Sequence, residues 1–212
     1  MDITENTYIE QNQTKQRYEF LQGMGDCYVQ IDDCTQAQQF YEKAAVLEPD
    51  AAAPYVGLGI VALRKDQLDD AETAFRVACR LDRNCAKAYS GLAVVAQQTE
   101  DYERAFEMYL KCLELDTDNL AALLGLFQTS CQMGTFSKVI HYLRVNLELH
   151  PDDTAVMFSL ASLYIKEAQF EEAKQVLIDL TKIQPKNVDA ANLLEEIEHN
   201  LSKLQKQKES KQ

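Results

Sequence analysis

Residues 52–85 decide the fold, and they read AAPYVGLGIVALRKDQLDDAETAFRVACRLDRNC. Two alanine-rich apolar segments stand on either side of the polar turn Asp66-Gln67. The chain has only 7 Gly and 4 Pro in 212 residues, and chains that are poor in both of these helix breakers are usually rich in helix. The stretch therefore predicts two helices joined by a tight turn.

The pattern of residues 52–85 recurs along the chain at a step of about 34 residues. Small residues, with one exception, recur early in the second segment of each copy: Ala37, Ala71, Ala105, Val139 and Ala173. Large apolar residues follow in phase: Tyr41, Phe75, Tyr109, Leu143 and Leu177. The first segments carry two adjacent columns: Met24, Leu58, Leu92, Leu126 and Leu160, then Gly25, Gly59, Ala93, Phe127 and Ala161. Pro49, Pro151 and Pro185 lie at multiples of the same step, so the columns together predict an internal repeat.

These columns resemble those of the tetratricopeptide repeat (TPR) family. Residues 52–85 match the family pattern at Tyr55, Leu58, Gly59, Ala71, Phe75, Ala78 and Leu81. The resemblance implies an all-α, right-handed superhelical solenoid of antiparallel helix pairs, which build one core because no single pair can bury its apolar face. We assign five repeats, at residues 18–51, 52–85, 86–119, 120–153 and 154–187.

The two ends of the chain fall outside these five windows. Residues 188–212 predict a capping helix with one apolar and one polar face, followed by a Lys-rich tail. Residues 1–17 are a polar lead-in, for which we expect a frayed or disordered segment, with an extra helix as the alternative.

Two local features follow from the repeat pattern. Thr35, Asp69 and Ser137 are expected to cap the second helices of their repeats. In the fourth repeat, the larger residues Phe127 and Val139 stand where the other repeats have mostly small ones. We therefore expect a wider interhelical spacing or a bend in that repeat, with local repacking as the alternative.

Composition excludes several classes of function. The net charge of -13 disfavours binding to nucleic acid and to anionic membranes, and no window approaches a membrane span. The six cysteines form no C-x-x-C pair and no zinc-finger spacing, which favours free thiols in a reducing compartment. Without an apolar leader segment near Met1, we expect a cytoplasmic protein.

In the family that the chain resembles, the first helices line a concave wall, and fixed positions of each repeat point inward. Carried onto this sequence, these positions form the inward-facing set: Val56, Ile60, Leu63, Arg64, Lys87, Val94, Leu124, Gln128, Phe158 and Ile165. Because large exposed apolar patches usually mark binding sites, this set predicts a groove for an extended peptide or an amphipathic helix. The alternatives are that these residues pack on neighbouring first helices, or that the N-terminal segment fills the groove.

One TPR subclass binds the C-terminal carboxylates of heat-shock chaperones through inward-facing Lys and Asn residues. Here Gln22 and Asp26 stand at those positions, so we expect no such clamp.

The sequence predicts neither catalysis nor a metal or cofactor. His141, His150 and His199 are the only histidines, and none lies in a recognisable arrangement with a cysteine or a pair of carboxylates. No phosphate-binding loop, zinc-protease or hydrolase motif occurs. Cys131, which the family positions project inward, is the one thiol worth testing for reactivity, although a small core-like residue is the preferred interpretation.

The predicted function is a protein-interaction adaptor that holds a peptide or helix of a partner in an apolar groove. The alternative is a self-assembling scaffold, which joins copies through its terminal repeats and recruits partners on its convex surface. Fold alone does not choose between the two.

Overall fold

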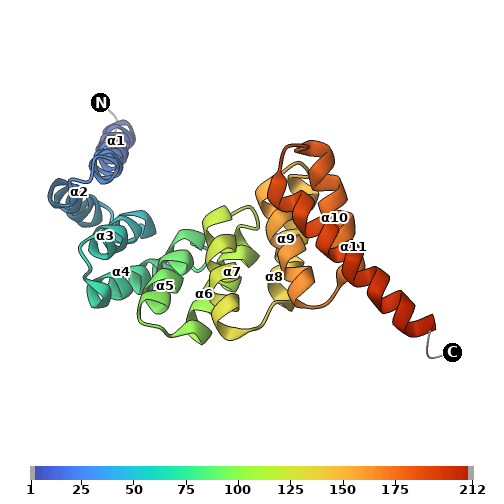
Figure 1. Cartoon of the computed structure of the whole chain (residues 1–212). Helices are drawn as coiled ribbons and strands as arrows, with labels where there is room; N and C mark the ends of the chain where they lie inside the picture. Colours follow the sequence, from blue (N-terminus) through green and yellow to red (C-terminus); the bar gives the residue numbers. More distant parts are fainter. Residues whose placement is uncertain (1–2, 210–212) are drawn as a thin grey trace. The chain divides into compact units, whose positions relative to one another are not determined.

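The computed structural model describes the backbone of residues 3–209 and the side chains of residues 12–203. Within residues 3–209 the chain forms eleven α-helices and no strand (Figure 1). The helices fall into two compact units, Met1–Asp116 and Thr117–Gln212.

The first unit contains six helices: α1 (Ile3–Gln30), α2 (Cys34–Leu47), α3 (Ala52–Arg64), α4 (Leu68–Leu81), α5 (Ala86–Gln98) and α6 (Tyr102–Leu115). Each helix packs on the next. Among the first helices of the repeats, α1 also contacts α3, and α3 contacts α5. The second unit contains α7 (Leu120–Met133), α8 (Ser137–Leu149), α9 (Thr154–Lys166), α10 (Phe170–Ile183) and α11 (Val188–Glu209). Both units are therefore built from consecutive helix pairs, as the repeat pattern predicts.

Aromatic rings held between glycines organise the core of the first unit. The Tyr41 ring of α2 lies against Gly25 of α1 on one side and Gly57 of α3 on the other. A Cβ added at either glycine would come within 3.0 Å of the ring. The Phe75 ring of α4 is held in the same way by α3 and α5, at Gly59 and Gly91. Each ring therefore joins a helix to its own repeat and to the next one.

A left-handed residue ends the first helix of each pair. Asp32, Asp66, Glu100, Gly134 and Ala168 have φ between 57° and 69°. The amide that follows each of them bonds back to the last turn of the helix, as in Asp33 N–H to the Tyr28 carbonyl at 2.9 Å. This is the Schellman arrangement, which satisfies helix carbonyls that would otherwise lack a donor.

The caps predicted for the second helices are wrong. Asp33, two residues before Thr35, caps α2 by accepting a hydrogen bond of 3.0 Å from the amide of Gln36. The N-cap positions of α4 and α8 hold Gln67 and Phe136, and neither side chain makes a capping bond within the described chain. Asp69 and Ser137 instead lie inside the first turns of those helices.

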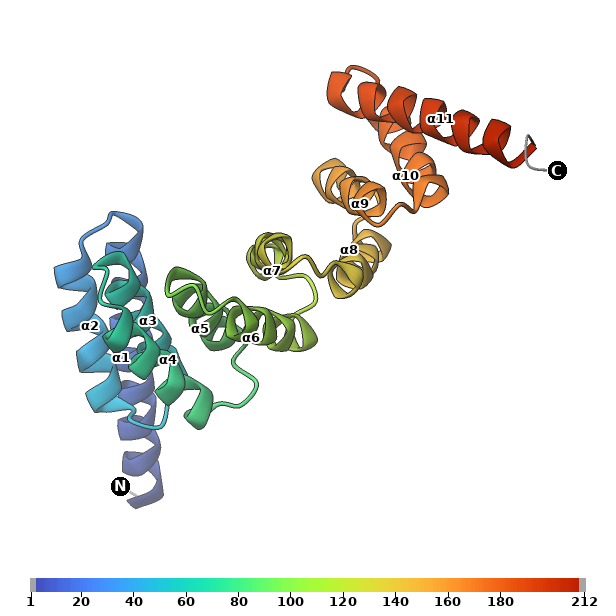
Figure 2. The ribbon, with the colours of Figure 1, turned by 60° about the horizontal axis from the view of Figure 1, so that its bottom comes forward.

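The expected disordered lead-in is also not what the structure shows. α1 is continuous from Ile3, so residues 3–17 lengthen the first helix of the first repeat (Figure 2). The segment has no proline, and its Glu, Gln, Lys and Arg residues favour helix even without an apolar face. Residues 1 and 2 lie outside the described residues.

At the other end, α11 packs on α10 as a capping helix should. Ala190 and Ile197 are buried, and Lys174 of α10 forms an ion pair of 2.9 Å with Glu198 of α11. The Lys-rich tail begins inside α11, and its last residues, 210–212, lie outside the described residues.

The helix pair α7 and α8 is packed much more loosely than the other helix pairs. It is the repeat in which Phe127 and Val139 replace small residues, and the wider spacing or bend expected there stays a prediction. The same pair contains buried polar side chains, those of Thr129, Ser130 and Asn146. Fewer close approaches and a more polar interior both reduce the apolar burial that holds this repeat together.

Candidate functional site

The structure gives the apolar members of the inward-facing set different surroundings in the first unit. Val56 is only 6% exposed and belongs to the hydrophobic cluster of α3, α4 and α5. Ile60 and Leu63 are half-buried against the same cluster, and Val94 of α5 is half-buried as well. Val56 is thus a core residue, which agrees with the alternative that these residues pack on neighbouring helices. The other three keep part of their surface exposed.

The two cations of the set differ in how they are held. The Arg64 guanidinium donates to the Val29 carbonyl at 2.7 Å and to the Asp32 carboxylate at 2.8 Å. It therefore joins the end of α3 to the turn between α1 and α2. Lys87, at the start of α5, is exposed.

Asp26 of α1 is exposed, and it is bonded to a buried tyrosine of the core. Its carboxylate accepts a hydrogen bond of 2.7 Å from the Tyr41 hydroxyl. Burial, together with this bond, raises the pKa of Tyr41 well above its ordinary value, so the phenol stays protonated and remains a donor.

The second unit carries the other members of the set. Leu124 of α7 is 55% exposed and Gln128, one turn later, is exposed too. Phe158 and Ile165 of α9 are half-buried. Lys166 lies next to this group, with its Nζ 5.3 Å from the centre of the Phe136 ring and 3.8 Å from the Cys131 sulfur.

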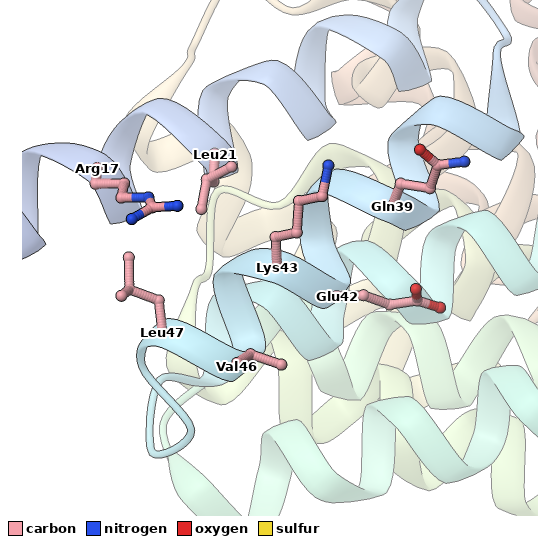
Figure 3. A pocket seen from close by; sticks show the side chains of 7 residues that line it. All are labelled: Arg17, Leu21, Gln39, Glu42, Lys43, Val46 and Leu47. Atoms are coloured by element: carbon pink, nitrogen blue, oxygen red, sulfur yellow. The ribbon is translucent and has the colours of Figure 1, made fainter.

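A cavity that the sequence pattern did not predict lies between α1 and α2. It has a volume of about 620 Å³ and is lined by Arg17, Leu21, Gln39, Glu42, Lys43, Val46 and Leu47 (Figure 3). Val46 at its rim is 81% exposed. A signal was present, because the corresponding residues of the other second helices are all charged: Arg80, Glu114, Glu148 and Lys182.

The described residues offer little for catalysis. Among the side chains of residues 12–203, no group of three or more His, Cys, Asp or Glu residues could hold a metal ion. The six cysteines are free, and burial raises the pKa of Cys79 and of Cys112 to about 11, which keeps both as unreactive thiols. No described helix is long and apolar enough to cross a membrane.

Comparison with known proteins places this geometry among helical repeats. Family models of the tetratricopeptide repeat match residues 23–84, 86–119 and 132–197. No curated protein matches the chain.

Solved structures of TPR proteins resemble the chain. PilF of Pseudomonas aeruginosa has a TM-score of 0.67 at 18% identity, over 90% of this chain and 93% of that one. YrrB, a TPR protein with an unusual peptide-binding site, has a TM-score of 0.61 at 21% identity, over 88% and 95%. The first TPR of Spaghetti (RPAP3), bound to an HSP90 peptide, has a TM-score of 0.53 at 23% identity, over 57% and 95%. Identities this low show a shared fold alone.

Proposed function

Because the chain belongs to the tetratricopeptide repeat family, whose members generally mediate protein–protein interaction, we propose that it is an adaptor that binds a peptide or helix of a partner protein. The binding residues are the members of the inward-facing set that keep exposed surface. In the first unit they are Ile60, Leu63, Lys87 and Val94, and in the second unit Leu124, Gln128, Phe158 and Ile165.

The single observation that carries this proposal is the 55% exposure of Leu124 on a first helix. A leucine side chain loses about 1.5–3 kcal/mol when it stands in water instead of an apolar contact. Leu120, one turn earlier, is 58% exposed as well. A partner that covers these side chains would recover part of that free energy, because each is already partly buried, and peptide binding by YrrB and by Spaghetti (RPAP3) is the precedent within the fold.

The experiment is an affinity capture from lysate of the source cell, with four full-length baits. One bait is wild type, one carries Lys87→Glu with Val94→Asp in the first unit, and one carries Leu124→Asp with Phe158→Asp in the second. The fourth bait carries Arg80→Glu, an exposed change on a second helix, as the surface control. Circular dichroism establishes that each bait keeps its helices.

We expect the captured partner to be lost from at least one of the two inward-facing variants and kept by the control. If all four folded baits capture the same proteins, the inward-facing set does not bind and the proposal is wrong. Loss from only one variant assigns the binding residues to that unit.

Self-assembly through the terminal repeats is the second candidate function. It is favoured by apolar side chains left in water on both terminal helices, Phe20 at 62% exposure on α1 and Val188 at 67% on α11. Sedimentation of the purified chain separates the candidates, since a monomer of 24.1 kDa at all concentrations favours the adaptor and a large assembly favours the scaffold.

A further inference from the structure

The first helix of an internal repeat has one face that receives an aromatic ring from the repeat before it. In α3, Gly57 lies against the ring of Tyr41 from α2. Val61, one turn later, belongs to the same hydrophobic cluster as Tyr41 and Ala37. The absence of a side chain at residue 57 is what lets the ring approach the helix backbone.

The arrangement is repeated one repeat further along the chain. In α5, Gly91 lies against the ring of Phe75 from α4. Ala88 and Val95 of α5 belong to the same cluster as Phe75 and its small neighbours. These neighbours are Ala71, four residues before the ring, and Ala78, three residues after it.

The column of residue 57 holds Gly57, Gly91, Ser159 and Leu193 in α3, α5, α9 and α11, and the residues one turn to either side of it are buried in these helices. On the N-terminal side they are Pro54, Ala88, Val156 and Ala190. On the C-terminal side they are Val61, Val95, Leu163 and Ile197. In α3 and α5 the column is thus the contact with the aromatic ring of the preceding repeat.

α1 carries the same face, and no other described helix packs on it. Phe20, Gly23 and Cys27 stand 34 residues before Pro54, Gly57 and Val61. Phe20 is 62% exposed, Cys27 is exposed, and a Cβ at Gly23 would meet no described atom within 4 Å. Ile31, one turn beyond Cys27, is 71% exposed and extends the apolar strip. We call these four residues, three in α1 and Ile31 directly after its end, the outer face of α1.

We propose that the outer face of α1 binds a helix of another protein, whose Tyr or Phe ring packs on Gly23. The partner helix carries a small residue four positions before the ring and another three positions after it. Ala37 and Ala44 stand in these places around Tyr41, as Ala71 and Ala78 do around Phe75. This surface is separate from the inward-facing set and goes beyond the proposed function.

A second folded copy of the chain does not meet this requirement. The large residues at the ring position of the second helices are all at most 3% exposed: Tyr41, Phe75, Tyr109, Leu143 and Leu177. A copy could offer one of these side chains only by opening a repeat. Phe20 of a copy is exposed, but Gln16 stands four positions before it in place of a small residue, so we assign the ring to a different protein.

The test uses the chain's own α4 sequence as the probe. A fluorescent peptide of residues 67–82, stapled as a helix on its solvent side and with Cys79→Ser, presents Phe75 between Ala71 and Ala78. Its binding to the full-length protein is measured by fluorescence anisotropy. The matched control is the same peptide with Phe75→Ala. We expect the control to bind about tenfold more weakly or worse, as truncation of an aromatic anchor does.

Protein variants locate the bound peptide. Gly23→Ala adds the Cβ that the ring cannot accommodate, and Gly23→Leu adds more bulk, so we expect a graded loss of binding. In the free protein, a Cβ at residue 23 meets no described atom within 4 Å. Thermal unfolding should therefore show that neither variant is destabilised. Bound peptide should also protect Cys27 from iodoacetamide. The inward-facing variant with Lys87→Glu and Val94→Asp should bind the peptide like wild type.

Four results would overturn the proposal. The first is no binding by wild type at high micromolar concentration, and the second is equal binding by the Gly23 variants. The third is loss of peptide binding in the variant with Lys87→Glu and Val94→Asp, which would place the peptide on the inward-facing set. The fourth is a concentration-dependent dimer of wild type that Gly23→Leu abolishes, which would assign the outer face to a second copy.

Discussion

Gly57 of α3 packs so closely on the ring of Tyr41 of α2 that a Cβ at residue 57 would lie within 3.0 Å of it. Gly57→Ala must therefore push the ring or the helix aside, at a cost of about 1–3 kcal/mol, as overpacking of a core does. Denaturant unfolding of the full chain, followed by circular dichroism, measures this loss.

Gly23→Ala is the control, because residue 23 occupies the same place in α1 and an added Cβ there meets no described atom within 4 Å. In this variant only the helix propensity changes, and we expect the free energy of unfolding to rise by up to about 1 kcal/mol. Opposite signs at two equivalent glycines would show that packing, not glycine itself, decides the outcome. Equal effects at both sites would contradict the assignment of the ring contact.

Repeat columns explain why so much of the fold could be predicted from the sequence. α3, α5, α7 and α9 begin at the first residues of the assigned windows, because column spacing fixes where each helix pair can start. Phe127 and Val139 also mark the fourth repeat as different from the others, and α7 and α8 are packed more loosely than the other helix pairs.

Burial of a particular side chain was harder to predict. The family pattern assigns Val56 an inward direction, but whether neighbouring first helices cover it depends on how closely α3 and α5 pack. The cap of α2 was also hard to predict, because it depends on where the preceding helix ends. The left-handed residue Asp32 ends α1 one residue before Asp33 starts to cap α2, so the true cap precedes Thr35 by two residues.

The ion pair between Glu72 and Arg104 predicts a specific acid sensitivity in the first unit. The two groups are 2.6 Å apart, and the hydrogen bond from Arg104 holds the pKa of Glu72 below its ordinary value. A carboxylate with a depressed pKa stabilises the fold above its unfolded pKa and loses that contribution as pH falls through the folded one. Because both side chains are partly exposed, we expect the ion pair to contribute only about 0.5–1 kcal/mol to the free energy of unfolding.

The measurement compares urea unfolding of wild type and Glu72→Gln between pH 6 and pH 3. The wild-type advantage should be present at pH 6 and shrink as the pH approaches 3. Arg104→Gln should erase the same advantage in a double-mutant cycle. A difference that stays constant with pH would mean that the ion pair contributes nothing.

Tyr109 of α6 predicts a loss of stability at high pH. Burial, with a smaller effect of Cys112, raises its pKa to about 12, and its hydroxyl donates a hydrogen bond of 2.8 Å to Gln97. Above the unfolded pKa of about 10, the unfolded chain releases a proton that the folded chain keeps, so folding weakens as pH rises towards 12. Tyr109→Phe removes this linkage together with one hydrogen bond.

At pH 8 the two proteins differ only by the hydrogen bond. We therefore expect the free energy of unfolding of wild type to be about 1 kcal/mol higher than that of Tyr109→Phe at this pH. The difference should shrink and then reverse between pH 10 and pH 12. Guanidinium unfolding at a series of pH values measures it. A constant difference across this range would show that Tyr109 ionises as easily in the folded chain as in the unfolded one.

The loose fourth repeat offers a site where the protein should tolerate or gain from an apolar change. Asn146 of α8 is 2% exposed, and no described group donates a hydrogen bond to its Oδ1. Ser130 of α7 is buried with an equally unpartnered Oγ. A buried polar atom without a partner costs about 1–3 kcal/mol, and Leu180 occupies the corresponding place in α10, fully buried. Asn146→Leu should therefore leave stability unchanged or raise it by about 1 kcal/mol.

Denaturant unfolding, with amide hydrogen exchange in α7 and α8, measures the effect of Asn146→Leu. Slower exchange in these two helices, but not in α9 and α10, would place the gain in the fourth repeat. Ser130→Ala serves as the matched control, because it removes a polar atom without adding bulk. If Asn146→Leu instead destabilises the chain by more than about 1 kcal/mol while Ser130→Ala does not, the amide is part of a satisfied polar network. The loose packing of α7 and α8 would then have to follow from Phe127 and Val139 alone.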